Sequence, residues 1–164
     1  MIGNDVVDLE LAELESNWKR KGFLDKIFTK NEQQYILNSE NQEIAVWNLW
    51  SRKEASYKIW NRETKIRRYN PTRFECFDMY SEIGKVKFET TIFYTKTEIL
   101  NSCIHSTATT EKSNLENIEI LENSIIIEKE NGIPFHTNKK KKIIPVSKSH
   151  HGRFEKIVSI KFPI

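Results

Sequence analysis

Residues 50–58 read Trp50-Ser51-Arg52-Lys53-Glu54-Ala55-Ser56-Tyr57-Lys58. Apolar residues recur around Glu54 at three- and four-residue steps, so the spacing predicts a helix with this carboxylate on its apolar face. Lys58 follows four residues later and is expected to lie beside it. An ionised carboxylate on a buried face costs several kcal/mol unless a cation or a metal compensates it. The position of Glu54 therefore indicates a functional group.

A second carboxylate poses the same problem near the N-terminus, where the chain reads Ile2-Gly3-Asn4-Asp5-Val6-Val7-Asp8-Leu9. Strand alternation places Asp5 on the same side as the apolar residues Val7 and Leu9. If Asp5 and Glu54 met, their charges would repel and one of them would hold a proton. A hard divalent cation would resolve this conflict, and Mg²⁺ is typically held by one or two carboxylates together with substrate phosphates.

Each carboxylate also has a simpler interpretation. Glu54 and Lys58 could form an ordinary ion pair on a helix surface. Asp5 or Asp8 could cap the helix that follows the first strand. Taken one at a time, each carboxylate fits its structural interpretation, because charged side chains usually lie on solvated faces.

The composition is that of a globular protein. The chain has 164 residues, of which 30% are charged and 38% hydrophobic, and we expect one domain over residues 1–164. No apolar run is long enough to span a membrane, and the N-terminal residues do not resemble a signal peptide. Cys76 and Cys103 are too few for a disulfide framework, which favours free thiols in the cytoplasm.

The formal net charge of +3 is unevenly distributed. One basic cluster comprises Arg62, Lys65, Arg67 and Arg68, and a second comprises Lys139, Lys140, Lys141 and Lys142. Such clusters indicate an anionic partner, which could be a phosphate group, a nucleic acid or an acidic protein.

A small basic nucleic-acid-binding domain is therefore an alternative, with tryptophans stacking on bases. It leaves Asp5 and Glu54 unexplained, and the spacing of Trp47 and Trp50 is that of core residues. His150 and His151 lack the neighbours of a zinc site.

The order of the expected elements indicates an α+β fold, because helices come first and strands later. We expect a strand over 1–9, a helix over 10–21 capped by Gly22, and helices opened by capping boxes at 29–32 and 39–42. Strands are expected over 73–80 and 85–95 with a turn at Gly84, around 99–105, and over 117–121, 124–129, 143–149 and 154–162. Asn131-Gly132 predicts a tight turn.

Five short motifs, in chain order, resemble those of 4′-phosphopantetheinyl transferases, and most of all the small holo-acyl-carrier-protein synthases. Residues 2–9 resemble the opening "GIDIVEL" strand, and Phe28-Thr29 with Glu32 resembles the "FT..E" element. Residues 50–58 are similar to the signature "W(S/T)xKEAxxK". Residues 131–134, Asn-Gly-Ile-Pro, resemble the "GKP" turn, and residues 146–150, Val-Ser-Lys-Ser-His, resemble the "xSxSH" strand. Residues 62–128 carry no motif of this kind.

The resemblance implies a long signature helix packed on an antiparallel sheet, and a Mg²⁺-dependent transfer of phosphopantetheine from coenzyme A to a serine of an acidic apo carrier protein. It implies that Asp5 and Glu54 hold Mg²⁺, that Glu54 takes the serine proton and that Lys58 stabilises the reacting oxygens. The implied coenzyme contacts are Lys53, Ser149, His150 and Arg62. A homotrimer, as in the small synthases, is a further expectation.

The chain departs from the family pattern at several positions. Asn4 replaces an aliphatic residue beside the metal aspartate, and Val7 stands where the two-lobed relatives carry a further acid. Ile133 replaces the lysine of "GKP", and the glycines that usually follow the signature helix are missing from residues 59–62. The carrier pathway stays open, with fatty acid, polyketide, aryl polyene and peptide synthesis as alternatives. An inactive relative that only binds carrier proteins is a further alternative, which the presence of Asp5, Glu54 and Lys58 disfavours.

Overall fold

The computed structural model describes residues 1–137 and 142–161. Within these ranges the strands form two antiparallel five-stranded sheets. The first sheet has the order β1-β5-β4-β3-β2, with β1 (Ile2–Asp8), β2 (Glu75–Phe77), β3 (Ile83–Phe88), β4 (Thr91–Leu100) and β5 (Cys103–Thr109). The second has the order β6-β10-β9-β8-β7, with β6 (Ile118–Leu121), β7 (Glu128–Glu130), β8 (Ile133–Thr137), β9 (Ile143–His151) and β10 (Phe154–Ile160).

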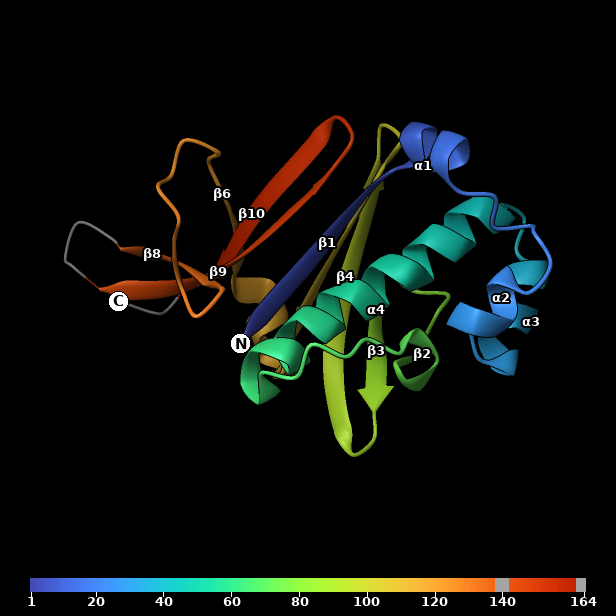
Figure 1. Cartoon of the computed structure of the whole chain (residues 1–164), viewed down its shortest axis with the longest axis horizontal. Coiled ribbons are helices and arrows are strands. Elements are labelled where there is room, and N and C mark those ends of the chain that lie inside the picture. Colours follow the sequence, from blue (N-terminus) through green and yellow to red (C-terminus); the bar gives the residue numbers. More distant parts are fainter. Residues whose placement is uncertain (138–141, 162–164) are drawn as a thin grey trace.

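The helices gather on one side of the first sheet. They are α1 (Leu9–Glu15), α2 (Phe23–Ile27), α3 (Lys30–Asn38) and the long α4 (Gln42–Thr64), with short 3₁₀ turns at Pro71–Arg73 and Lys112–Asn117. Figure 1 shows α4 running along β1, with the second sheet on the opposite side of that strand. The α+β class and the long helix packed on an antiparallel sheet are therefore confirmed.

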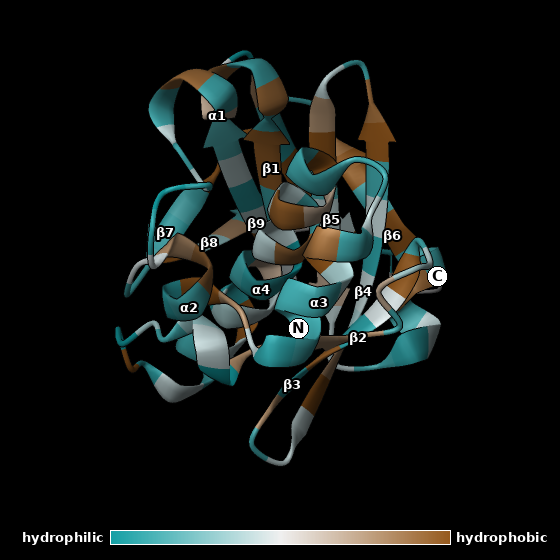
Figure 2. Cartoon of the chain, turned by 90° about the vertical axis from the view of Figure 1, so that its right-hand side faces the viewer, coloured by the Kyte–Doolittle hydropathy of each residue, from teal (hydrophilic) through white to brown (hydrophobic). Residues whose placement is uncertain are grey.

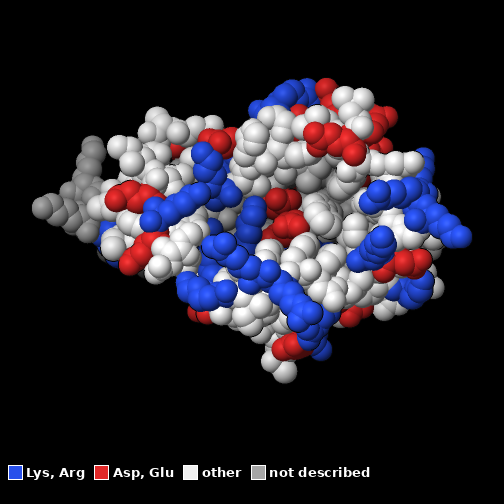
Figure 3. Space-filling view, viewed as in Figure 1, with Lys and Arg blue, Asp and Glu red and all other residues white. Residues whose placement is uncertain are grey.

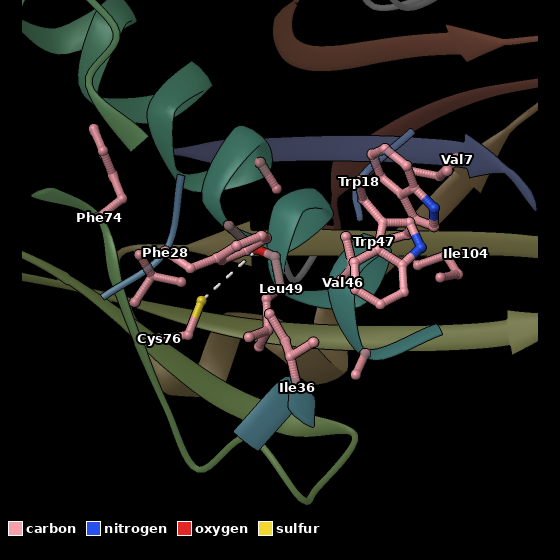
Figure 4. Close-up of a cluster of buried hydrophobic side chains, with 14 of the residues drawn as sticks. Val7, Trp18, Phe28, Ile36, Val46, Trp47, Leu49, Phe74, Cys76 and Ile104 are labelled. Atoms are coloured by element: carbon pink, nitrogen blue, oxygen red, sulfur yellow. Dashed lines mark hydrogen bonds between the residues drawn. The ribbon is translucent and has the colours of Figure 1, made fainter. Parts of the chain in front are cut away.

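The main core lies between α4 and the first sheet. Val46, Leu49, Ala55 and Ile59 of α4 are fully buried, and they form one cluster with side chains from the strands. Figure 4 shows Trp18 and Trp47 beside Val7 and Ile104, and the Cys76 thiol directed at the backbone oxygen of Leu49. Buried and exposed residues alternate along β3, as expected for a strand with one covered face, whereas β1 and β5 are buried along nearly their whole length. Figure 2 shows hydrophobic and hydrophilic segments along the strands.

Several local signals in the sequence are confirmed. The side chain of Thr29 accepts a hydrogen bond from the backbone of Glu32, whose own carboxylate accepts one from the backbone of Thr29, so the capping box forms in full. Asn131 and Gly132 both have positive φ and connect β7 to β8. Gly152, also at positive φ, lies between β9 and β10, the closing pair of strands.

The expected helix over 10–21 is shorter than predicted. The Asp8 side chain caps it at the backbone N–H of Glu10, so α1 begins at Leu9, and the extended backbone of Ser16 ends it. Gly22 has the left-handed conformation expected of it, but it precedes α2 as its N-cap instead of closing α1. Leu14, in the last turn of α1, is 84% exposed.

Other boundaries were also wrong. Gly84 lies inside β3, paired with Thr95, and the connection between β2 and β3 falls at residues 78–82 instead. A further turn at Glu89 divides the strand expected over 85–95 into β3 and β4. A β-carbon at Gly84 would lie 2.1 Å from Nη1 of Arg52, so this glycine serves a close approach and not a turn. The strand expected around 99–105 is interrupted by a turn at Asn101 and Ser102. The cap of α4 is Asn41, which accepts from the backbone N–H of Ile44.

Candidate active site

Asp5 and Glu54 meet between the middle of β1 and the middle of α4. Burial raises the pKa of Glu54 to about 7, the negative charge of Asp5 adds to the rise, and Lys58 opposes it. Burial also raises the pKa of Asp5, against the charge of Lys58 and a hydrogen bond from Ser149. The structure therefore brings together the two carboxylates that the sequence singles out, in surroundings that disfavour two negative charges.

Lys58 reaches across to β1. Its Nζ lies 2.6 Å from the backbone oxygen of Asn4 and 3.4 Å from Oδ1 of Asp5. About a quarter of its side chain, 27%, is exposed, so the ammonium group is held at an edge open to solvent. The lysine thus joins α4 to the carboxylate of the strand, instead of forming only a pair along the helix surface.

Ser149 faces Asp5 from β9. Its hydroxyl accepts a hydrogen bond from the backbone N–H of Val6 at 3.1 Å and donates one to Oδ1 of Asp5 at 3.1 Å. Only 6% of the residue is exposed. His150, the next residue, points to the other side of the strand and is exposed. Of these two expected phosphate contacts, therefore, only His150 is open to a ligand.

A cleft of about 700 Å³ lies between the C-terminal half of α4 and the β7–β8 hairpin, and Lys58, which contacts Asp5, is among its lining residues. We call it the basic cleft, because none of its described lining residues is acidic and its basic residues are Lys58, Arg62, Lys65, Arg67, Lys129 and Lys148. Arg62 is mostly buried, and its guanidinium donates to the backbone oxygen of Ile2. Burial lowers the pKa of Arg62 to about 10.

A second cleft, of about 450 Å³, is lined by Asp5 and Glu54 themselves. We call it the apolar cleft, because its walls also include Val7, Ala12, Phe23, Ile27, Trp47 and Trp50. Arg20 lies at its border, and His150 lines both clefts. Figure 3 shows acidic atoms in a hollow near the centre of this face, bordered by lysine and arginine side chains.

Lys53 does not lie at the site. Its side chain is fully buried, and its Nζ donates to the backbone oxygens of Ile27 and Pro71 and to the carboxylate of Glu32 at 2.7 Å. Glu32 in turn accepts the backbone N–H of Cys76. The lysine therefore ties α3 and the segment after α4 to the helix, and the sequence-based assignment of a phosphate contact does not fit its position.

The basic residues that follow α4 do not all lie at the same groove. Arg67 lines the basic cleft, and its guanidinium lies near the hairpin turn, 3.4 Å from where Gly132 would carry a β-carbon. Arg68 lines a different groove with Trp60 and Phe88. Lys139, Lys140 and Lys141 of the predicted lysine block lie outside the described residues.

Sequence reasoning missed two lysines of the basic cleft and the arginine of the apolar cleft. Lys148 is two residues from His150, so strand alternation could have placed both on one face. Lys129 lies in the segment without motifs, and no pattern marked it. Arg20 follows a turn whose path the sequence does not reveal.

The donor set suits one hard cation. Among residues 1–137 and 142–161, no three His, Cys, Asp or Glu side chains gather as a metal cluster, so Asp5 and Glu54 are the oxygen ligands available. A divalent cation would relieve the repulsion between two carboxylates whose pKa values are raised. Mg²⁺ is commonly bound by only one or two protein carboxylates, with substrate phosphates as further ligands. The neighbouring His151 uses its Nδ1 atom to accept the backbone N–H of Asp8, so this nitrogen is already engaged.

Asp8 has the structural role that the sequence left open for it. Its carboxylate caps α1 and accepts hydrogen bonds from the backbone and guanidinium of Arg153, which hold the pKa of Asp8 well below its usual range. Trp18 and Trp47 are buried in the core, so neither presents a face for base stacking.

Comparison with known proteins identifies the family of the chain. Residues 1–121 match the family model described as the 4′-phosphopantetheinyl transferase superfamily. A holo-[acyl-carrier-protein] synthase of Protochlamydia amoebophila is 39% identical over 59 residues, which are 35% of this chain and 47% of the relative. The chain thus spans about half the length of this curated relative.

One solved structure shows the same fold, and a second matches over nearly the whole chain with a lower score. The apo-ACPS structure of Chronobacterium ammoiniagenes is 13% identical with a TM-score of 0.53, over 66% of this chain and 93% of that one. The holo-[acyl-carrier-protein] synthase of Thermotoga maritima is 15% identical with a TM-score of 0.49, over 99% and 83% of the two chains. No helix in the described ranges is long and apolar enough to cross a membrane.

Proposed function

The chain belongs to the 4′-phosphopantetheinyl transferase superfamily, and on that premise we propose that it transfers the phosphopantetheine arm of coenzyme A to a serine of an apo carrier protein. Adenosine 3′,5′-bisphosphate is the second product, and Mg²⁺ is the metal. One observation carries the proposal: the half-buried pair of Asp5 and Glu54 lines the apolar cleft, and the basic cleft lies next to it, with His150 lining both.

The basic cleft suits the nucleotide end of coenzyme A. That part of the molecule carries a pyrophosphate and a 3′-phosphate, and the cleft offers only cations and neutral groups among its described lining residues. Arginine and lysine side chains bind phosphate oxygens through charge-assisted hydrogen bonds. Arg67 and Lys129, at the hairpin end of the cleft, and Lys148 with His150, nearer the carboxylates, are the proposed contacts in place of Lys53 and Ser149.

Asp5 and Glu54 would hold the metal, which when bound neutralises charge on the pyrophosphate. Burial raises the pKa of Glu54 to about 7, which would suit it to accept the serine proton. Lys58 is held by Asn4 and Asp5, so its ammonium is oriented toward the junction of the clefts. There it would stabilise the negative charge that develops on the transferred phosphate.

The acceptor serine would arrive through the apolar cleft. A displacement at phosphorus requires the attacking and leaving oxygens to lie roughly in line, so the acceptor and the leaving part of the donor would lie on opposite sides of the phosphorus atom. The apolar walls can receive side chains that flank the serine, and Arg20 offers a cation to an acidic carrier. A cytoplasmic location and a homotrimer are part of this proposal on the strength of the family resemblance alone.

The experiment is to incubate the protein with coenzyme A, Mg²⁺ and a panel of apo carrier proteins, and then to weigh the carriers. The proposal predicts that at least one carrier gains the mass of one phosphopantetheine and that adenosine 3′,5′-bisphosphate appears in equal amount. The same carrier with alanine in place of its serine should gain nothing. If no carrier from fatty acid, polyketide, aryl polyene or peptide pathways is modified, the proposed activity is wrong.

A further inference from the structure

The outer edge of β1 is bonded to side chains instead of to another strand. The backbone N–H groups of Asn4, Val6 and Asp8 donate to Ser147 Oγ, Ser149 Oγ and His151 Nδ1, at 3.0, 3.1 and 2.9 Å. Alternate residues of β9 thus meet alternate residues of β1, and the edge N–H groups find partners without a backbone ladder. Figure 1 shows the second sheet lying along this edge.

Within this row, Ser149 has a second partner. A hydroxyl has one proton to donate, and since the Val6 N–H already donates to Ser149 Oγ, that proton is directed to Oδ1 of Asp5. Lys58 Nζ approaches the same oxygen, at 3.4 Å. Oδ1 of Asp5 is therefore held from two sides, which fixes the rotation of the carboxylate in front of Glu54.

We infer that Ser149 is a positioning residue, which holds the Asp5 carboxylate in the orientation that binds a divalent cation. This inference rests on the proposed function. The burial of Ser149 and the engagement of its single proton leave it no free donor for a coenzyme phosphate. Groups that orient a metal ligand from behind typically contribute about 10- to 100-fold to metal affinity.

Ser147 provides a matched control. It lies two residues earlier on the same strand, is also buried, and accepts a backbone N–H of β1 in the same way, but its contact is with Asn4 and not with Asp5. Ser147→Ala and Ser149→Ala therefore lose the same kind of bond between β9 and β1. The two variants differ in the hydrogen bond to the metal-binding carboxylate.

The test measures Mn²⁺ binding by the paramagnetic resonance of the free ion, with coenzyme A present, and coenzyme A binding by calorimetry in EDTA. Thermal unfolding first shows that both variants are folded. Ser149→Ala should weaken Mn²⁺ binding by about 10- to 100-fold, while Ser147→Ala stays within about twofold of wild type. Neither variant should change the metal-free affinity for coenzyme A.

Three results would overturn the inference. Equal Mn²⁺ affinities in the two variants would mean that both serines only connect β9 to β1 and that neither orients the metal ligand. Weaker coenzyme A binding by Ser149→Ala in EDTA would make Ser149 a phosphate contact. If wild type and Glu54→Gln both bind no Mn²⁺, the proposed metal site itself is absent, and the inference falls together with it.

Discussion

A β-carbon on Gly3 would lie 2.0 Å from the backbone oxygen of Ala55. The backbones of β1 and α4 therefore touch at this point, with no room for a side chain between them. Gly3 is two residues from Asp5, and Ala55 follows Glu54 directly. The closeness of the two carboxylates thus depends on this backbone contact.

The first prediction concerns that contact. Gly3→Ala should force α4 away from β1, because the atom in the way belongs to the backbone and cannot rotate aside. We expect a loss of about 1–3 kcal/mol in the free energy of unfolding and a large loss of transfer activity in the protein that remains folded. Chemical denaturation and the carrier assay measure the two effects.

Gly22→Ala is its control. Gly22 has a φ of 81° and no atom within 4 Å of a built β-carbon, so alanine there strains the backbone without displacing a neighbour. It should cost about 1 kcal/mol and leave activity per folded molecule unchanged. A Gly3→Ala protein with wild-type activity would show that the spacing of the carboxylates does not depend on the contact.

The second prediction follows from the raised pKa of Glu54. Since the folded state binds this proton more tightly than the unfolded state, wild-type stability should fall as pH rises from about 4.5 to about 7. Glu54→Gln removes this titration. In EDTA, the variant should gain little at pH 5 and up to about 3 kcal/mol at pH 8, the value corresponding to that pKa difference.

Urea denaturation of both proteins across this pH range checks the sign as well as the size. A constant difference between pH 5 and pH 8 would mean that Glu54 titrates normally. If the variant instead lost stability relative to wild type as pH rises, the Glu54 carboxylate would already be compensated in the folded protein.

The third prediction separates Lys53 from the coenzyme. Lys53→Met leaves the buried carboxylate of Glu32 without its cation, and breaking such a pair typically costs about 3–5 kcal/mol. We expect a lower midpoint of unfolding, and an unchanged KM for coenzyme A in the folded fraction. Lys148 lies in the basic cleft, so Lys148→Met should instead raise the KM for coenzyme A. The free energy of unfolding of this variant should stay within about 0.5 kcal/mol of wild type. A stable Lys53→Met protein with a raised KM would return Lys53 to the coenzyme site.

The fourth prediction uses two neighbouring arginines that face different grooves. Arg67→Ala removes a cation from the basic cleft and should raise the KM for coenzyme A about tenfold, the usual effect of one hydrogen bond to a charged group. Arg68→Ala should stay within about twofold, because Arg68 lines the groove beside Trp60. If Arg67 holds the 3′-phosphate, its loss should matter less with dephospho-coenzyme A. Equal effects of the two substitutions would place the coenzyme elsewhere.

The sequence predicted best where a side chain contradicts its own periodic pattern. Asp5 and Glu54 each interrupt an apolar face, so the conflict was visible without coordinates. Lys53 was misassigned because its partner Glu32 lies 21 residues earlier in the chain, and only the packing of α3 on α4 brings them together. Gly84 was wrongly assigned to a turn. A glycine can be required by a turn or by the close approach of another side chain, and the sequence does not show that Arg52 packs against this position.

The basic cleft was predictable only in part. Arg62, Lys65 and Arg67 follow the signature helix, so their clustering is local and appears in the sequence. Lys129 reaches the same cleft from a hairpin more than sixty residues later, and neither charge patterning nor strand alternation reports such a long-range meeting. Ser149 was recognised from its motif, but its direction toward Asp5 depends on how β9 crosses the edge of β1.

The most direct test of the central claim is the rate at which a responsive apo carrier gains phosphopantetheine, measured by mass with saturating coenzyme A and Mg²⁺. The comparison is between wild type, Asp5→Asn and Glu54→Gln, each shown to be folded. We predict turnover by wild type that stops in EDTA, and a loss of at least about 100-fold in each variant. Near wild-type turnover by either variant in Mg²⁺ would contradict the assignment of this carboxylate pair as the catalytic centre.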